Sequence, residues 1–231
     1  KIKKEYIIKN YHNVDIQIIL KENNTSYSKD LKINIDEGKK LKIKKIKILG
    51  NNSFSNKKII KNFESIKEKK WYKFWKGEYE EEKFELDLSK LELFYKNNGY
   101  RDMQILSKDI EYKEDGIFLT ININEGEKNY YKLFTFAGNS QFTDDELFES
   151  LNLSVEEVYN EDKFNLALYN INNKYMDEGY YFISIENNLV PSDSNKLVLN
   201  FNINESEKTK IRKIFITGNE KTYDNVIRRE M

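Results

Sequence analysis

The sequence predicts an α+β fold made of tandem β-α-α-β-β repeats. Each repeat is expected to form a three-stranded mixed sheet with two antiparallel helices on one face. Apolar residues alternate where we expect strands and recur at helical spacing where we expect helices. Landmarks also recur along the chain: 88 residues separate the strand-ending Gly50 from Gly138, and 80 separate Gly138 from Gly218. Such self-similarity decides the architecture. The glutamates that close each repeat follow the same two intervals, at Glu37, Glu125 and Glu205.

The repeats predict how the chain is divided. We expect complete repeats at 41–127 and 128–207, the C-terminal part of a preceding repeat at 1–40, and the start of a following one at 208–231. The chain starts and stops inside elements, so we expect a fragment of a longer protein. Connections are short and contain no Pro-rich or Gly/Ser-rich spacer, which predicts a semi-rigid string of units.

Charge and cysteine content exclude several classes of protein. The chain balances 39 Lys and Arg against 39 Asp and Glu, and the two signs are interspersed. This argues against a nucleic-acid-binding protein, which needs a basic face. No apolar run approaches the length of a membrane-spanning helix. The absence of cysteine excludes disulfides and thiolate metal sites.

The first residues predict the end of a preceding repeat. A helical pattern stops at Asn10, and asparagine is the usual second choice for the left-handed residue that ends a helix. Alternating apolar residues then predict strands over 13–20 and 28–37, joined by a polar turn.

The first helix of each complete repeat has a capped start. Ser55 is a good N-cap, and Phe54 is placed to pack on Ile59 as a hydrophobic staple. In the second repeat, Thr143 and Glu146 have the spacing of a capping box. The expected buried stripe of the first helix is Ile59, Ile60, Phe63 and Ile66.

The second helix carries the clearest periodicity. Its apolar residues fall at i, i+4, i+7 and i+11, and large apolar residues recur 80 positions later. Gly99 and Gly179 then end the two helices. The residues of this stripe are Phe84, Leu88, Leu91 and Tyr95, followed by Phe164, Leu168, Ile171 and Tyr175.

The remaining strands give each sheet one buried and one polar face. Ile46 and Ile48 alternate in the first strand, and Leu119 and Ile121 alternate in the third. Two antiparallel helices bring the third strand back parallel to the first, and a hairpin joins the second strand to the third. We therefore expect the third strand in the middle and the second at an edge.

The sequence contains no recognisable set of catalytic residues. The only histidine, His12, has no second histidine or cysteine with which to build a metal or nucleophile site, so we interpret it as a surface residue. No glycine-rich loop has phosphate-binding spacing. The acidic run 78–82 fits a solvated first turn of a helix, and the recurring Glu125-Gly126 pair fits a turn.

Two tryptophans mark an insertion of eight residues between the helices of the first complete repeat. Trp71 and Trp75 could form a binding hot spot in an inserted loop. They could equally fold back over their own core, which we favour.

These motifs together resemble the polypeptide-transport-associated (POTRA) repeat, and the resemblance covers the entire chain. They are the Gly50-Asn51 strand ending, the helix pair, the Gly99-Tyr100 turn and the Glu125-Gly126 ending. Asn10 and Ser206 depart from the pattern by replacing glycine. The order resembles the end of repeat two, repeats three and four, and the start of repeat five of the outer-membrane assembly members of the family. The residues that suggest this order are Trp71, Trp75, Tyr79, Asp87-Leu88, Gly218-Asn219 and the segments 211–214 and 226–231.

The resemblance implies a function. POTRA repeats lie on the periplasmic side of the bacterial outer membrane, receive unfolded outer-membrane proteins and bind accessory lipoproteins. The barrel that anchors such proteins in the membrane is not in this sequence. We expect a non-enzymatic binding module without cofactor, metal, nucleic-acid or small-molecule ligand. The alternative is a structural or protein-interaction scaffold, of the cell-division or two-partner-secretion type.

Two sites are expected from this function. The second strand of the first complete repeat, about 103–112, should be an open edge that accepts an extended client peptide. Its counterpart near 181–190 ranks lower because Pro191 follows it. The expected client-binding residues are Met103, Gln104, Ile105, Leu106, Ser107 and Ile110. The second expected site is a partner contact at Arg228, Arg229 and Glu230, for which a solvated first helical turn is an equally good explanation.

Overall fold

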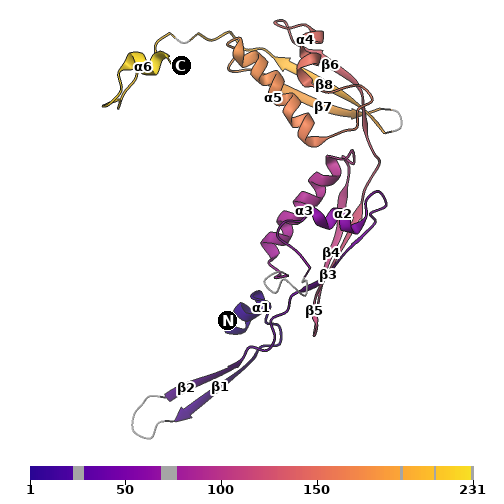
Figure 1. The fold of residues 1–231 in the computed structure, drawn as a ribbon, viewed down its shortest axis with the longest axis vertical. Helices are drawn as coiled ribbons and strands as arrows, with labels where there is room; N and C mark the ends of the chain where they lie inside the picture. The colour runs from indigo at the N-terminus through magenta and orange to yellow at the C-terminus, as the bar shows by residue number, and fades with distance from the viewer. Residues whose placement is uncertain (23–28, 69–76, 193–194, 211, 230–231) are drawn as a thin grey trace. The chain divides into compact units, whose positions relative to one another are not determined.

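The structure is a computed structural model, and it describes residues 1–22, 29–68, 77–192, 195–210 and 212–229 (Figure 1). Its helices are α1 (Ile2–Ile8), α2 (Asn56–Lys61), α3 (Glu81–Lys96), α4 (Asp144–Leu151), α5 (Glu161–Asp177) and α6 (Asp224–Arg229). Its strands are β1 (Asp15–Glu22), β2 (Lys29–Asp36), β3 (Ile43–Leu49), β4 (Gln104–Lys113), β5 (Gly116–Asn124), β6 (Tyr130–Ala137), β7 (Ser184–Pro191) and β8 (Lys196–Asn204).

The strand order confirms the predicted sheets. Both complete repeats form three-stranded sheets, ordered β3-β5-β4 and β6-β8-β7, so the closing strand is central in each. In the first repeat β3 runs parallel to β5, and β4 runs antiparallel to it. The segment before the first complete repeat contributes the antiparallel pair β1-β2.

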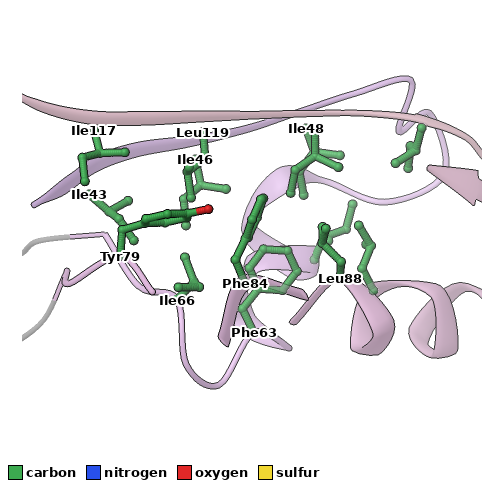
Figure 2. Packing of buried hydrophobic residues seen from close by; sticks show 14 of the residues in the cluster. Ile43, Ile46, Ile48, Phe63, Ile66, Tyr79, Phe84, Leu88, Ile117 and Leu119 are labelled. Carbon is green, nitrogen blue, oxygen red and sulfur yellow. The ribbon is translucent and has the colours of Figure 1, made fainter. Parts of the chain in front are cut away.

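The core of the first repeat lies between its sheet and its helices. Figure 2 shows Ile46, Ile48 and Leu119 of the sheet beside Phe63, Phe84 and Leu88 of the helical layer. Seven of the residues expected in this core are buried: Ile46, Ile48, Phe84, Leu88, Leu91, Leu119 and Ile121. Ile60, which was expected in the buried stripe of the first helix, is only half-buried. The helical period on α3 and the strand alternation therefore meet in one apolar layer.

The second repeat has the same core with two differences. Phe164, Ile171, Leu199 and Phe201 are buried as expected. Leu168 is only half-buried, whereas Ala167 beside it is fully buried. The second difference is Phe136, which is half-buried near the end of β6 and stacks on Phe201 with ring centroids 5.2 Å apart.

The first helix of the first repeat is shorter than its apolar stripe. α2 ends at Lys61, so the buried Phe63 and Ile66 lie in the segment that follows it. The cause is the buried carboxylate of Asp87 on α3. It accepts hydrogen bonds from the main-chain N–H groups of Glu64, Ser65 and Ile66, at 2.9, 3.0 and 2.6 Å. These N–H groups thus bond to a side chain and not to a preceding helical turn.

The predicted helix caps are present. Lys58 N donates to Ser55 Oγ at 3.3 Å, and Thr143 and Glu146 form a complete capping box. Asn10, Gly99 and Gly179 end their helices with φ of 69°, 102° and 93°, in the left-handed region.

The same three residues also join consecutive repeats. The carbonyls of Asn10, Gly99 and Gly179 accept N–H bonds from the first residues of the segment that follows, at 2.9, 2.8 and 2.8 Å. The donors are Leu41, Asn129 and Thr209.

By its contacts the chain divides into two compact units whose border runs through the second repeat. The first unit is Lys1–Lys132, Val155–Asp162 and Pro191–Leu197. The second is Leu133–Ser154, Lys163–Val190 and Val198–Met231. The loop before α5 belongs to the first unit because Asn97, at the end of α3, holds it. Asn160 Nδ2 donates to the Asn97 carbonyl at 2.8 Å, and Asp162 N donates to Asn97 Oδ1 at 3.0 Å.

Leu88→Ala tests the core assignment. Because Leu88 is 5% exposed, its truncation is expected to lower the free energy of unfolding by about 2–5 kcal/mol. Leu86→Ala is the matched control, since Leu86 lies on the same helix and is 60% exposed. Urea denaturation of both variants provides the measurement. Equal losses would show that the buried face of α3 is misassigned.

Candidate functional site: an open sheet edge beside helix α3

β4 is an edge strand of the first repeat, because β5 is its only neighbour in the sheet among the described residues. Its register places Gln104 opposite Asn124, Asp109 opposite Thr120 and Tyr112 opposite Ile117. An edge strand presents main-chain N–H and C=O groups that no neighbouring strand satisfies. Only alternate residues of β4 turn these groups away from β5.

The pairing of β5 with β3 determines which residues of β4 turn their main-chain groups outward. The N–H of Ile117 donates to the carbonyl of Lys42 beside β3, so the main-chain groups of Ile117 point away from β4. In an antiparallel pair the residue opposite such a position also turns its main-chain groups outward. Tyr112 is that residue, and alternation adds Ile110 and Lys108. A register shift then skips Leu106, so Ile105 is the next residue whose main-chain groups point outward.

The outward main-chain groups and the helix-facing side chains belong to the same residues. Ile105, Lys108, Ile110 and Tyr112 lie opposite buried residues of β5 and so share the face that α3 covers. Ile105 and Ile110 are half-buried and pack against the core. A strand added to this edge would therefore bring alternate side chains into the space between β4 and α3.

The six expected client-binding residues have different environments. Met103 precedes β4 and is only 5% exposed, so its side chain belongs to the core. Leu106 occupies the bulge and is 58% exposed. Gln104 and Ser107 are exposed, but their partners in the register direct their main-chain groups toward β5. Ile105 and Ile110 are the two that combine an outward amide with an apolar side chain.

Two hollows flank the edge strand, one at each end. One of about 460 Å³ is lined by the last turns of α3 and the start of β4, from Glu92 and Lys96 to Arg101 through Ile105. The other, of about 750 Å³, lies at the Tyr112 end beside the start of α3. Between them Lys108 forms an ion pair with Glu85 of α3. The space between β4 and α3 is thus open at both ends and is crossed by the Lys108–Glu85 ion pair.

His12 lies beside the Tyr112 end. Its ring stacks on that of Tyr112, with centroids 3.9 Å apart and planes inclined by 29°. Burial lowers the pKa of His12, which favours the neutral imidazole. His12 is partly exposed, and sequence spacing gave no signal for its contact with Tyr112.

A buried carboxylate anchors the C-terminal end of α3. Glu125, which follows the central strand, accepts hydrogen bonds from Tyr95 Oη at 2.9 Å and from Ser53 Oγ at 2.8 Å. It also accepts from the Ser53 main-chain N–H at 3.0 Å. Burial and this carboxylate raise the pKa of Tyr95, so its hydroxyl stays a donor. The Glu-Gly ending is thus a structural anchor as well as a turn.

The second repeat has an equivalent edge, β7, beside α5. Pro191 is the last residue of this strand, so seven residues precede it. The residues that occupy the positions of Arg101 and Asp102 are Tyr181 and Phe182, which are 48% and 75% exposed.

The two remaining expected sites are the tryptophan loop and the partner contact at 228–230. Trp71, Trp75 and Glu230 lie outside the described residues. Arg228 donates to the carbonyl of Ile214 at 2.7 Å, a contact within the C-terminal segment of the chain. Within the described ranges there is no cluster of His, Cys, Asp or Glu that could hold a metal ion. In the same ranges no helix is both long enough and apolar enough to cross a membrane.

Comparison with known proteins identifies the repeats. The POTRA family model, described as surface antigen variable number repeat, matches residues 41–126 and again residues 130–206. The chain belongs to the POTRA family. Two POTRA matches side by side confirm the resemblance drawn from the glycine, tyrosine and glutamate landmarks.

The relatives of this POTRA chain are assembly factors. It is 32% identical over 219 residues to the outer membrane protein assembly factor BamA of Buchnera aphidicola, covering 92% of the chain and 35% of the relative. It is 31% identical over 236 residues to BamA of Neisseria meningitidis serogroup B, covering 100% and 29%. The chain therefore spans about a third of the length of these relatives.

A solved structure shares the fold. A crystal structure of POTRA repeats 3–5 of Haemophilus influenzae BamA aligns with a TM-score of 0.62 and 24% identity. The alignment covers 83% of this chain and 76% of the solved one.

Tyr95→Phe tests the anchor that sets the end of α3. The variant loses the Tyr95–Glu125 hydrogen bond and leaves a buried carboxylate with one donor fewer, so we expect it to cost about 1 kcal/mol of unfolding free energy. Tyr169→Phe is the control, because Tyr169 is 60% exposed. Thermal unfolding of both proteins compares them. A Tyr95→Phe protein as stable as the control would contradict this role for the pair.

Proposed function

We propose that this chain is a periplasmic, non-enzymatic binding module of an outer-membrane β-barrel assembly protein. In this proposal β4 receives extended segments of unfolded outer-membrane proteins as an additional strand. The observation that carries it is the coincidence of outward main-chain groups with helix-facing side chains at Ile105 and Ile110. The naming of the relatives as outer membrane protein assembly factors supports the same function.

Strand addition suits a client that varies in sequence and must be released. The hydrogen bonds of an added strand involve main-chain atoms alone, so they form with any extended peptide except at proline. Specificity then comes from alternate side chains, which would enter the space between β4 and α3. A single added strand gives weak binding, and weak binding permits transfer toward a barrel.

The remaining parts of the proposal concern partners and numbering. We propose that the complete repeats correspond to repeats three and four of such a protein, whose barrel follows in the full-length chain. Accessory lipoproteins would bind on other surfaces, with Arg229 as a candidate contact. The bond from Arg228 to the Ile214 carbonyl favours a structural role for that arginine.

A scaffold without client binding is the alternative function. The exposed Tyr181 and Phe182 on the second repeat would suit a fixed protein contact. The two functions differ in what β4 does: a scaffold requires its fold, whereas the proposed function requires its free amides.

Lys108→Pro tests the proposed function. Lys108 turns its N–H outward, so proline there removes a donor from the free edge and none from the ladder to β5. Lys108→Ala is the matched control, since both variants lose the ion pair with Glu85. In fluorescence titrations, Lys108→Pro should bind extended outer-membrane-protein peptides about threefold to tenfold more weakly than Lys108→Ala.

Circular dichroism would establish that both variants fold. Equal affinities in two folded proteins would rule out strand addition at β4 and favour the scaffold.

A further inference from the structure

We propose that the hollow at the Tyr112 end of β4 is a recognition pocket for one arginine or lysine side chain of the added strand. This inference rests on the proposed function of β4 and deepens it, because a basic residue in this pocket would set the register of the client.

The pocket adjoins the free edge directly. Tyr112, which turns its main-chain groups outward, is one of its walls, and Tyr79 and Ile8 are others. Tyr112 and Ile8 are 45% and 71% exposed, so this wall is open to solvent. The hollow measures about 750 Å³, which accommodates a long side chain with its neighbours. A strand paired along β4 would reach it without leaving the edge.

The polar lining of the pocket is acidic. Glu80, Glu81, Glu82 and Glu85 line it, and among the described residues no lysine or arginine does. Glu80 pairs with Lys83 and Glu85 with Lys108. Glu81 and Glu82 have no basic partner among the described residues. The Glu81 carboxylate adds to burial in raising the pKa of both Tyr79 and Tyr112, which places its charge near the two aromatic walls.

His12 adds an unused polar atom. Its Nε2 is buried and has no hydrogen-bond partner within the described part of the chain. A neutral imidazole leaves the carboxylate charge uncompensated and can accept a hydrogen bond from a cation. Aromatic walls, carboxylates and a free acceptor together match an arginine or lysine, whose apolar stem and charged head need both surfaces.

Some of these glutamates also stabilise α3, because they lie in its first turn. Acidic residues in a first turn interact favourably with the helix dipole. That effect explains glutamates at this position, but it requires neither an open hollow nor tyrosine walls. The opposite end of the edge provides a comparison, because Lys96 and Arg101 there balance Glu92 and Asp102. The acidic excess is confined to the Tyr112 end, so a basic client residue has one preferred position.

The experiment compares two synthetic peptides of about ten residues, the length of an added strand. They share an alternating valine-threonine sequence and differ only at one end, where one carries arginine and the other citrulline, its neutral isostere. Each is titrated by NMR into the isotopically labelled full chain. The arginine peptide should bind about fivefold more tightly, since the interaction involves partly exposed charges.

Two double variants test whether the difference in affinity between the arginine and citrulline peptides arises in the pocket. In Glu81→Gln/Glu82→Gln the preference for arginine should disappear while the citrulline peptide binds as before. The control Glu127→Gln/Glu207→Gln makes the same charge change at two exposed glutamates that do not line the pocket, and it should keep the preference. Shifts at Tyr112 and His12 that only the arginine peptide causes would support the assignment.

The experiment distinguishes failure of the pocket proposal from failure of strand addition at β4. If both peptides shift residues 104–112 with equal affinity, the pocket proposal is wrong and strand addition stands. If neither peptide shifts those residues, strand addition at β4 is wrong and the pocket proposal falls with it. A preference that survives in Glu81→Gln/Glu82→Gln also overturns the proposal.

Discussion

The carboxylate that ends each central strand holds the rest of the repeat in place. In the first repeat Glu125 binds Tyr95 of α3 and Ser53 of the turn before α2, so one group ties the sheet to both helices. Glu205 does the same with Tyr175 and Gln141, and Glu37 accepts from Tyr6. In each case a second tyrosine, five residues later, packs edge-on against the first. The last turn of the second helix thereby acquires a fixed position against the sheet.

This constraint determines what the edge strand can do. With α3 anchored at Tyr95 and the central strand flanked by β3, β4 remains the free edge of this sheet, with a hollow at each of its ends. The alternation of main-chain direction then selects Ile105, Lys108 and Ile110 as the residues that meet a client. The bridge from Lys108 to Glu85 is consistent with the way natural edges use charge to discourage unwanted pairing.

The repeat architecture was predictable from the sequence because its determinants are periodic. The stripe on α3, the glycines in left-handed conformation and the alternation of β5 all follow from local spacing. Contacts between distant residues were not predictable. The stacking of His12 on Tyr112 and the capture of three N–H groups by Asp87 join segments whose separation depends on the fold. The bulge at Leu106 likewise shifts the outward direction from Leu106 to Ile105, which no hydrophobic pattern reveals. The recurrence of a tyrosine before each Gly-Tyr or Asn-Tyr turn was a usable signal for the carboxylate anchor.

Hydrogen exchange along β4 is the measurement that tests the central claim most directly. In the free protein, the amides of Ile105, Lys108 and Ile110 should exchange quickly, whereas those of Asp109 and Glu111 should be protected by β5. A saturating extended peptide should slow the first set and leave the second unchanged. If the peptide binds and the first set still exchanges quickly, or if protection does not alternate in the free protein, β4 is not the strand that receives a client.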